Sequence, residues 1–370
     1  MIALSLLHLK TLENPCTKKP HLLELKLPHN NNTEGEFFTL HLYNNNNITD
    51  KQESILVDNT KKGNERPWRE KKMANVAYYE LLHILDFKKM ERVKACAEIL
   101  EYKMDKQTLE KHLFKVWFCK SPLCPMCNWR KTMKHGIQSQ RIIAEVMKRK
   151  PTCRWLFLTL SVKNVYDGED LSQSLKDMAI GFNRLMKYKK VKQNLIGFMR
   201  ATEVTVNNTD NSYNQHMHVL LCVESTYFYN AENYVNQKQW MAFWKKAMKL
   251  DYDPVAHIQI VRPKNKHKSD MESVVAETVK YPVKDTDYRT RDQQKNLQRV
   301  ADLEQGLYKK RLISYGGLLK EIHKELNLDD VEDGDLVHVD DEEKEIHENA
   351  YSVVAYWNWE RENYFIKNHE

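Results

Sequence analysis

The sequence predicts an α+β protein whose central part is a ferredoxin-like, split βαβ antiparallel sheet with helices on one face. Two observations predict this fold. Between residues 154 and 284, apolar runs typical of strands alternate with segments of helical periodicity in the order β-α-β-β-α-β-α. The second and third of these strands are separated only by a short polar turn, so we expect them to form a hairpin.

Each element follows from its own residues. The first strand is the apolar run RWLFLTLSV (154–162), and the hairpin strands are LIGFMRATEVTV (195–206) and QHMHVLLCVE (215–224), with the turn at 207–214. The last strand is HIQIVR (257–262). Apolar residues three or four apart predict the intervening helices, namely Leu171, Leu175, Met178, Phe182 and Leu185, and then Trp240, Phe243, Trp244 and Met248.

Three further regions flank this core, which we place at residues 151–290. Residues 1–70 contain asparagine runs and predict a flexible extension. Residues 71–150 predict a zinc-binding and basic helical module: a helix over 73–94, a short crossover from 96 to 118, and a basic amphipathic helix over 128–148. Residues 291–370 predict a mostly helical C-terminal region, with helix over 295–327 and an aromatic segment at 352–366 that docks as a strand or helix. The acidic stretch at 329–348 is interpreted as a linker, with a partner surface or a DNA mimic that limits non-specific binding as alternatives.

Composition narrows the class of protein. No apolar run approaches the ~18–20 residues that span a bilayer, and no secretory signal is recognisable, so we expect a cytoplasmic protein with no membrane partner. The net charge is +7, yet the stretch 329–348 is strongly acidic, so the rest of the chain is more basic than this value indicates. A chain with this excess of positive charge is suited to bind the phosphate backbone of a nucleic acid. The candidate contacts are Lys120, Arg130, Lys131, Lys134 and Arg141, and a second cluster at Lys187, Lys189, Lys190 and Lys192.

The cysteine spacing favours a metal over disulfides. Cys119, Cys124 and Cys127 lie within nine residues, and Cys96 precedes them. Four thiolates form a closed tetrahedral zinc site, whose role is structural because no coordination position stays open. His112 competes with Cys96 as the fourth ligand, and four free cysteines are the alternative interpretation.

A second metal site is predicted on the hairpin. His216 and His218 are separated by one residue, so both imidazoles point to the same face of their strand. With the turn centred between residues 210 and 211, Glu203 lies across the hairpin close to His218. Two imidazoles and a carboxylate with open positions suit Mn²⁺ or Mg²⁺ bound to a phosphate oxygen. The alternative for Glu203 is an ordinary surface ion pair.

The segment 277–284 contributes the candidate catalytic groups. On a helix, Glu277 and Tyr281 share one face and Lys284 lies nearly one turn further on. A phenol can attack phosphorus when a nearby cation or a metal stabilises the negative charge that develops on the phosphate. A carboxylate can accept a proton from water in a second step. Pro282 is expected to kink this helix at Tyr281.

Together these motifs resemble a known superfamily. FLTLSV (157–162), QHMHVLL (215–221) and ETVKYPVK (277–284) occur in the order and spacing of the three motifs of HUH endonucleases. From about residue 72 onward the chain resembles the rolling-circle replication initiators of small Gram-positive plasmids, in the group with one tyrosine and a glutamate four residues before it. The resemblance implies His216 and His218 as metal ligands, Tyr281 as the nucleophile and Glu277 as the activator of the terminating water.

The resemblance also implies partners and a reaction. The partners are plasmid origin DNA, a host helicase and a second copy in a homodimer. The reaction is nicking of one strand at the double-strand origin through a 5′-phosphotyrosine, with later strand transfer and hydrolysis. Two alternatives remain: a conjugative relaxase, whose tyrosine usually precedes a cluster of three histidines, and a zinc-dependent DNA-binding regulator without catalysis.

Overall fold

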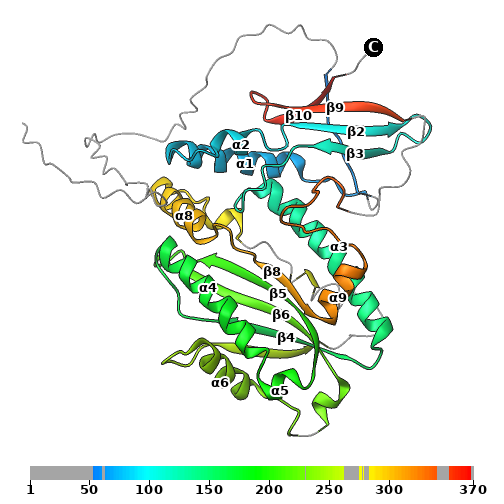
Figure 1. The fold of residues 1–370 in the computed structure, drawn as a ribbon. Helices are drawn as coiled ribbons and strands as arrows, with labels where there is room; N and C mark the ends of the chain where they lie inside the picture. The colour runs from blue at the N-terminus through cyan, green and yellow to red at the C-terminus, as the bar shows by residue number, and fades with distance from the viewer. Residues whose placement is uncertain are drawn as a thin grey trace, which may run out of the picture. The chain divides into compact units, whose positions relative to one another are not determined.

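The computed structural model describes residues 53–60, 63–229, 231–261, 275–276, 278, 283–339 and 350–367. Within these ranges the chain is mixed α+β and forms two five-stranded antiparallel sheets (Figure 1). No helix in the same ranges is long and apolar enough to cross a membrane. The two sheets are described in turn because each supports one of the candidate sites.

The first sheet combines strands from both ends of the described chain. Its order is β1 (Glu53–Ile55), β10 (Asn363–Lys367), β9 (Ala350–Asn358), β2 (Ile99–Asp105) and β3 (Lys111–Val116). Alternation along β2 buries Leu100 and Tyr102 while Ile99 stays half exposed. The buried face packs with α1 (Trp68–Ile84) and the short helix α2 (Met90–Lys94), which lie along one side of the sheet (Figure 1).

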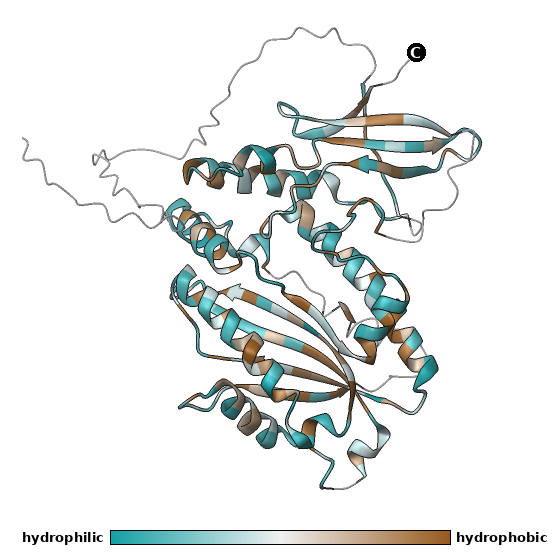
Figure 2. Cartoon of the chain, in the orientation of Figure 1, coloured by the Kyte–Doolittle hydropathy of each residue, from teal (hydrophilic) through white to brown (hydrophobic). Residues whose placement is uncertain are grey.

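The second sheet has the order β7 (Ala256–Val261), β4 (Arg154–Ser161), β6 (Tyr213–Val223), β5 (Leu195–Val206) and β8 (Ile313–Gly317). One face packs against α4 (Gly168–Leu185) and α6 (Gln237–Met248), and α5 (Lys189–Lys192) and the 3₁₀ turn Ser225–Phe228 contribute to the same core. Apolar residues run along these strands (Figure 2). Trp240 and Trp244 of α6 are fully buried there, so this helix is fixed against the sheet.

Among the described residues, helices cover one end of the opposite face of the second sheet. There the C-terminal half of α3 (Pro125–Arg149) and α9 (Leu318–Glu325) pack on the sheet through a core that includes Ile142, Val146, Met199, Leu220 and Leu319. The other end of this face carries Glu203, His216 and His218 and is here called the open half, because the core of α3 and α9 does not include these three residues.

The four strands and the two intervening helices predicted for the core are confirmed, with ends that shift by a few residues, while the helix expected at 277–284 lies mostly outside the described residues. The helix expected over 128–148 is α3, which begins at Pro125 as a helix typically does with proline in its first turn. Two expectations are wrong. The crossover expected at 96–118 is the hairpin of β2 and β3, and the helix expected at 295–327 is α8 (Gln293–Gly306), β8 and α9, preceded by a short 3₁₀ turn at Asp285–Asp287.

Long-range pairing contributes to both errors. β2 pairs with β9 and β8 pairs with β5, each partner lying more than a hundred residues away, although β2 also pairs with the neighbouring β3. Tertiary pairing of this kind overrides the local periodicity on which the prediction rested. The aromatic segment expected as a strand or helix forms the strands β9 and β10. The four regions proposed from the sequence stay a prediction, although residues 291–370 contribute strands to both sheets.

The two segments expected to be unstructured are ordered where the structure describes them. Residues 53–60 and 63–70 of the expected flexible extension contain β1 and the start of α1, and Leu56 and Trp68 are buried. Residues 329–339 of the expected acidic linker, here called the acidic strap, bury Val331, Leu336 and Val339. The linker and extension interpretations are therefore wrong for these residues; residues 1–52 and 340–349 lie outside the described ranges.

Candidate functional site

The hairpin of β5 and β6 positions the first candidate site. Glu203 stands directly opposite His216, and Ala201 stands opposite His218. The sequence had placed Glu203 nearer to His218, so the register differs by two residues from the expected one. A shift of two leaves every side chain on its original face, because the strand period is two. Glu203 and both histidines consequently share the open half of the sheet.

Their ligand atoms converge. Oε2 of Glu203 lies 3.3 Å from Nε2 of His216 and 3.2 Å from Nε2 of His218, and the three ligand atoms all lie within 4.8 Å of one another. Burial raises the pKa of the Glu203 carboxyl, but hydrogen bonds from His216 and His218 outweigh it and hold the pKa far below its usual range. The carboxylate is therefore charged, as a metal ligand must be.

Neighbouring side chains orient the two imidazoles. Nδ1 of His216 lies 3.1 Å from Oδ1 of Asn214, and Nδ1 of His218 lies 3.4 Å from Oγ1 of Thr159. The ring of Phe157 stacks on His218 at 5.4 Å between centroids. Since Nδ1 of each ring is engaged, Nε2 is the nitrogen that faces Glu203, and a metal ion can replace the proton between them. Sequence patterns alone do not indicate these three residues, although Phe157 and Thr159 lie within the first motif.

The remaining predicted catalytic residues are only partly located. Glu277, Tyr281 and Pro282 lie outside the described ranges. Lys284 is described and exposed, and its carbonyl oxygen accepts a hydrogen bond from the backbone N–H of Asp287. Val275 and Val283, on either side of the segment, are buried, Val275 in the core shared with β4 and β6.

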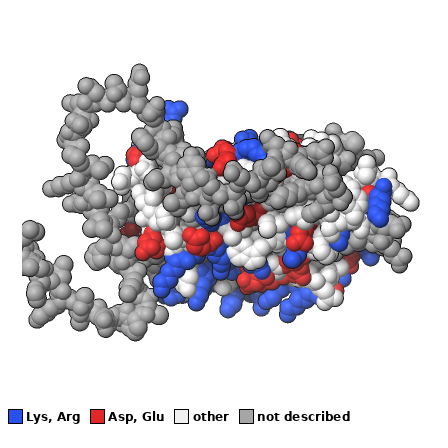
Figure 3. All heavy atoms as spheres, turned by 90° about the horizontal axis from the view of Figure 1, so that it is seen from above, with Lys and Arg blue, Asp and Glu red and all other residues white. Residues whose placement is uncertain are grey.

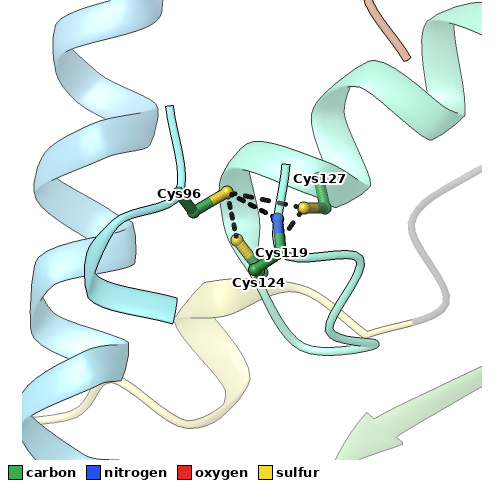
Figure 4. Close-up of side chains that lie close together, drawn as sticks. All are labelled: Cys96, Cys119, Cys124 and Cys127. Atoms are coloured by element: carbon green, nitrogen blue, oxygen red, sulfur yellow. Dashed lines mark hydrogen bonds between the residues drawn. The ribbon is translucent and has the colours of Figure 1, made fainter. Parts of the chain in front are cut away.

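The second candidate site is formed by four cysteines. Cys96 follows α2, Cys119 and Cys124 lie between β3 and α3, and Cys127 is in the first turn of α3 (Figure 4). All four are buried, and their ligand atoms lie within 4.8 Å of one another. The Sγ–Sγ distances from Cys96 are 3.6 Å to Cys127 and 3.7 Å to Cys124, close to the ~3.8 Å edge of a tetrahedron with zinc–sulfur bonds of about 2.3 Å. His112 is not part of the cluster, since it lies on β3 opposite Lys103.

Hydrogen-bond donors surround these sulfurs. The backbone N–H of Lys120 points to Cys127 Sγ at 3.2 Å, and the Nδ2 of Asn75 donates to Cys124 Sγ at 3.3 Å. Nearby, the fully buried Lys72 donates to the carbonyl oxygen of Cys96 at 2.7 Å. Donors of this kind stabilise thiolates rather than thiols. Asn75 and Lys72 come from α1, which is too far away in the sequence for cysteine spacing to reveal them.

The basic residues on α3 near the cysteines are not available to DNA phosphates. Lys131 pairs with Glu332 at 2.5 Å, and Lys134 pairs with Asp329 at 2.7 Å. Arg130 donates to the carbonyl oxygen of Leu336. Further contacts join Lys120 to the Asp333 carbonyl and Gln138 to the Asp329 carbonyl. The prediction that Arg130, Lys131 and Lys134 contact phosphates does not hold in this structure, because these side chains are buried and the acidic strap occupies that side of α3. Lys120 is exposed, and its contact with a phosphate stays a prediction.

Other predicted phosphate contacts stay exposed. Arg141 on α3 and Lys187, Lys189 and Lys192 near α5 lie on the surface, while Lys190 is half buried. On the described part of the face drawn in Figure 3, basic and acidic side chains lie intermingled. Charge alone therefore does not identify the DNA-binding surface on this face.

Comparison with known proteins establishes the family. The sequence model of a family described as "Replication protein" matches residues 110–365. The chain belongs to this family. A "Replication protein" of Staphylococcus aureus is 72% identical over 235 residues, which cover 64% of this chain and all of that protein. A "Protein rep" of Lactiplantibacillus plantarum is 49% identical over 315 residues, which cover 84% of this chain and 99% of that protein.

More distant relatives carry the same description. A "Protein rep" of Streptococcus pneumoniae is 40% identical over 320 residues, covering 86% of this chain and 97% of that protein. No solved structure matches the chain. The resemblance to Gram-positive plasmid replication initiators, drawn from the three motifs, is thereby confirmed.

Proposed function

We propose that this replication protein initiates rolling-circle replication by nicking one strand of the plasmid double-strand origin through Tyr281. The observation that carries the proposal is the convergence of Glu203, His216 and His218 on the open half of the second sheet. The strand order β7-β4-β6-β5, with the first strand between the last and the third, supports a ferredoxin-like HUH core.

In the proposed nicking step, each candidate residue has one role. The Tyr281 oxygen attacks the scissile phosphorus and loses its proton, the bond from phosphorus to the 3′ oxygen breaks, and that oxygen gains a proton. The products are a 5′-phosphotyrosine and a free 3′-OH. Lys284 reduces the negative charge that builds up. A Mn²⁺ or Mg²⁺ ion held by Glu203, His216 and His218 would supply Lewis acidity at the phosphate.

Termination uses the same groups in a second cycle. Glu277 accepts a proton from the water that hydrolyses the phosphotyrosine, or strand transfer to a 3′-OH reverses the first step. We further propose a structural Zn²⁺ on Cys96, Cys119, Cys124 and Cys127, since the four thiols fit a closed tetrahedral site. A host helicase and a homodimer are proposed from the family resemblance.

The test is covalent trapping. The full chain is incubated with Mn²⁺ and single-stranded oligonucleotides that tile the plasmid's origin region, and products are separated on denaturing gels. A protein–DNA adduct is expected for the wild type and is lost in Tyr281→Phe. Tyr308→Phe is the matched control, since Tyr308 is an exposed tyrosine at the end of α8. Absence of any Tyr281-dependent adduct would reject the nickase and favour a DNA-binding regulator without catalysis.

A further inference from the structure

Arg299 of α8 joins two loops that lie far apart in the sequence. Its side chain is buried, with 1% of the residue exposed. Nε donates to Oδ1 of Asn211 at 2.6 Å, and Nη1 donates to the carbonyl oxygen of Asp287 at 2.9 Å. Asn211 belongs to the turn between β5 and β6, whereas Asp287 ends the 3₁₀ turn Asp285–Asp287. One buried guanidinium therefore connects the tip of the histidine hairpin to this 3₁₀ turn.

Both loops lead to groups of the proposed reaction. The hairpin turn follows β5, which carries Glu203, and precedes β6, which carries His216 and His218. The 3₁₀ turn directly follows Lys284, and Lys284 follows Tyr281 closely in the sequence. A contact between the two loops is therefore placed to set the distance from the proposed metal ligands to Lys284.

The carboxyl group of Asp287 indicates that the 3₁₀ turn lies beside the histidine site. Burial raises the pKa of this carboxyl, and the negative charge of Glu203 adds to the effect, against the hydrogen bond and the charge of Lys284. Charges influence one another in this way only when they are close. Oδ2 of Asp287 is buried and has no hydrogen-bond partner among the described residues. Such a group is costly to hold, and Arg299 supports the same residue at its carbonyl oxygen.

Other contacts hold the two ends of the 3₁₀ turn. Tyr288 is 1% exposed, and its hydroxyl donates to the carbonyl oxygen of Leu123 at 2.6 Å, next to Cys124 in the chain. Val283 is buried in the same core as the four cysteines. These contacts tie the turn to the cysteine region, and Arg299 ties it to the histidine hairpin.

We propose that Arg299 is a positioning residue of the nicking reaction, which holds the 3₁₀ turn against the hairpin turn so that Lys284 keeps a fixed place relative to Glu203. This role rests on the proposed function, because it serves that reaction. Two donors on one planar guanidinium reach both loops at once, which a single ammonium does not reproduce. A displacement of about 1 Å in a reacting group can cost ~100-fold in rate, so a contact away from the phosphate can control the reaction.

The test removes one of the two hydrogen bonds without straining the backbone. Asn211 has a φ of 61°, which glycine adopts freely, so Asn211→Gly deletes the acceptor and leaves the turn intact. At saturating origin oligonucleotide, adduct formation should slow about tenfold or more, while the Kd for that oligonucleotide changes by less than about twofold. Asn211→Asp keeps an acceptor oxygen and should retain the wild-type rate. Asn327→Gly, at an exposed asparagine with a φ of 48°, is the matched control.

Arg299→Lys completes a double-mutant cycle. It should slow adduct formation at least as much as Asn211→Gly, and the double variant should be little slower than Arg299→Lys alone, because both changes break the same contact. Leu303→Ala removes a fully buried side chain of α8 and is the control for lost stability, with a lower melting temperature and an unchanged rate. Independent, additive effects of the two substitutions would overturn the proposal.

Amide hydrogen exchange supplies a measurement that needs no cleavage. Peptides covering residues 283–290 should exchange faster in Asn211→Gly and Arg299→Lys than in the wild type and in Asn327→Gly. Unchanged exchange would overturn the contact between the loops. Faster exchange with an unchanged adduct rate would overturn the positioning role while the nickase stands. If the wild type forms no adduct, the proposed function fails and the positioning role fails with it, whatever the exchange shows.

Discussion

The four cysteines and the Glu203–His216–His218 group differ in what surrounds their ligand atoms. The cysteines are all buried, and donors from α1 and from the loop before α3 point at their sulfurs. Glu203 is buried, whereas the two histidines retain part of their exposure, and their outer nitrogens are held by Asn214 and Thr159. The enclosed site suits a metal that holds the fold, and the open site suits a metal that meets a substrate.

The largest expected effect follows from breaking the enclosed site. Cys124→Ser should release the proposed zinc and lower the melting temperature by more than about 10 °C, because a structural metal contributes its binding free energy to folding. Metal content and thermal melting measure this. Cys153→Ser is the control, since Cys153 is a buried thiol outside the cluster. If Cys124→Ser retains its metal and its stability, the four thiols are not a zinc site.

Breaking the open site should instead remove chemistry. His216→Ala combined with His218→Ala is expected to lower the rate of adduct formation about 1,000-fold, since a Lewis acid supplies several kcal/mol at the transition state. The melting temperature should change by only a few degrees, and single-strand affinity should persist. A fall in melting temperature as large as that of Cys124→Ser would show that the histidine site also holds the fold together, which would contradict its assignment to chemistry.

Acid should destabilise the fold through His135 on α3, a residue that belongs to neither candidate metal site. Burial lowers the pKa of His135 to about 3 from 6.5, and neither ring nitrogen has a hydrogen-bond partner among the described residues. Between these values the unfolded chain binds a proton that the folded chain refuses, so stability falls as the pH drops below 6.5. The expected slope is about 1.4 kcal/mol per pH unit.

Chemical denaturation at several pH values measures this slope, and His135→Leu should reduce it by the same amount. The variant's rate of adduct formation at neutral pH should stay that of the wild type, because His135 is not among the groups that form the open site. An unchanged slope in His135→Leu would show that His135 does not titrate differently in the folded and unfolded chains.

The smallest effect concerns a donor to the enclosed site. Asn75→Ala removes hydrogen bonds to Cys124 Sγ and to the carbonyl oxygen of Val93, so the free energy of unfolding should fall by ~1–3 kcal/mol. The metal should remain bound but leave faster to a chelator, as is typical when an outer partner of a ligand is lost. Equal chelation rates in wild type and variant would mean that the sulfurs do not depend on Asn75.

Local patterns predicted the histidine hairpin and the clustering of the cysteines, because in both cases the informative residues are close in sequence. His216 and His218 needed only the strand period, and Glu203 needed only a hairpin turn. The three cysteines within nine residues predicted their cluster directly, and Cys96 over His112 followed once β3 was seen as a strand.

Long-range pairing was not predictable in the same way. The basic face of α3 is neutralised by the acidic strap about 200 residues later, and neither sequence segment shows that the other is its partner. β2 and β8 were missed because each is an ordinary short segment until a distant strand pairs with it. The position of Tyr281 relative to the histidines remains a prediction from the motifs.

The pairing of β1 with β10 delays completion of the first sheet during biosynthesis. Glu53 can pair with Lys367, and β2 with β9, only after almost the whole described chain has been synthesised. At bacterial elongation rates of ~5–20 residues per second, that delay is tens of seconds. A nascent chain interrupted before residue 350 would leave the outer edge of β2 unpaired. The edge of β2 that pairs with β9 would then remain a free strand edge, which is a site for aggregation.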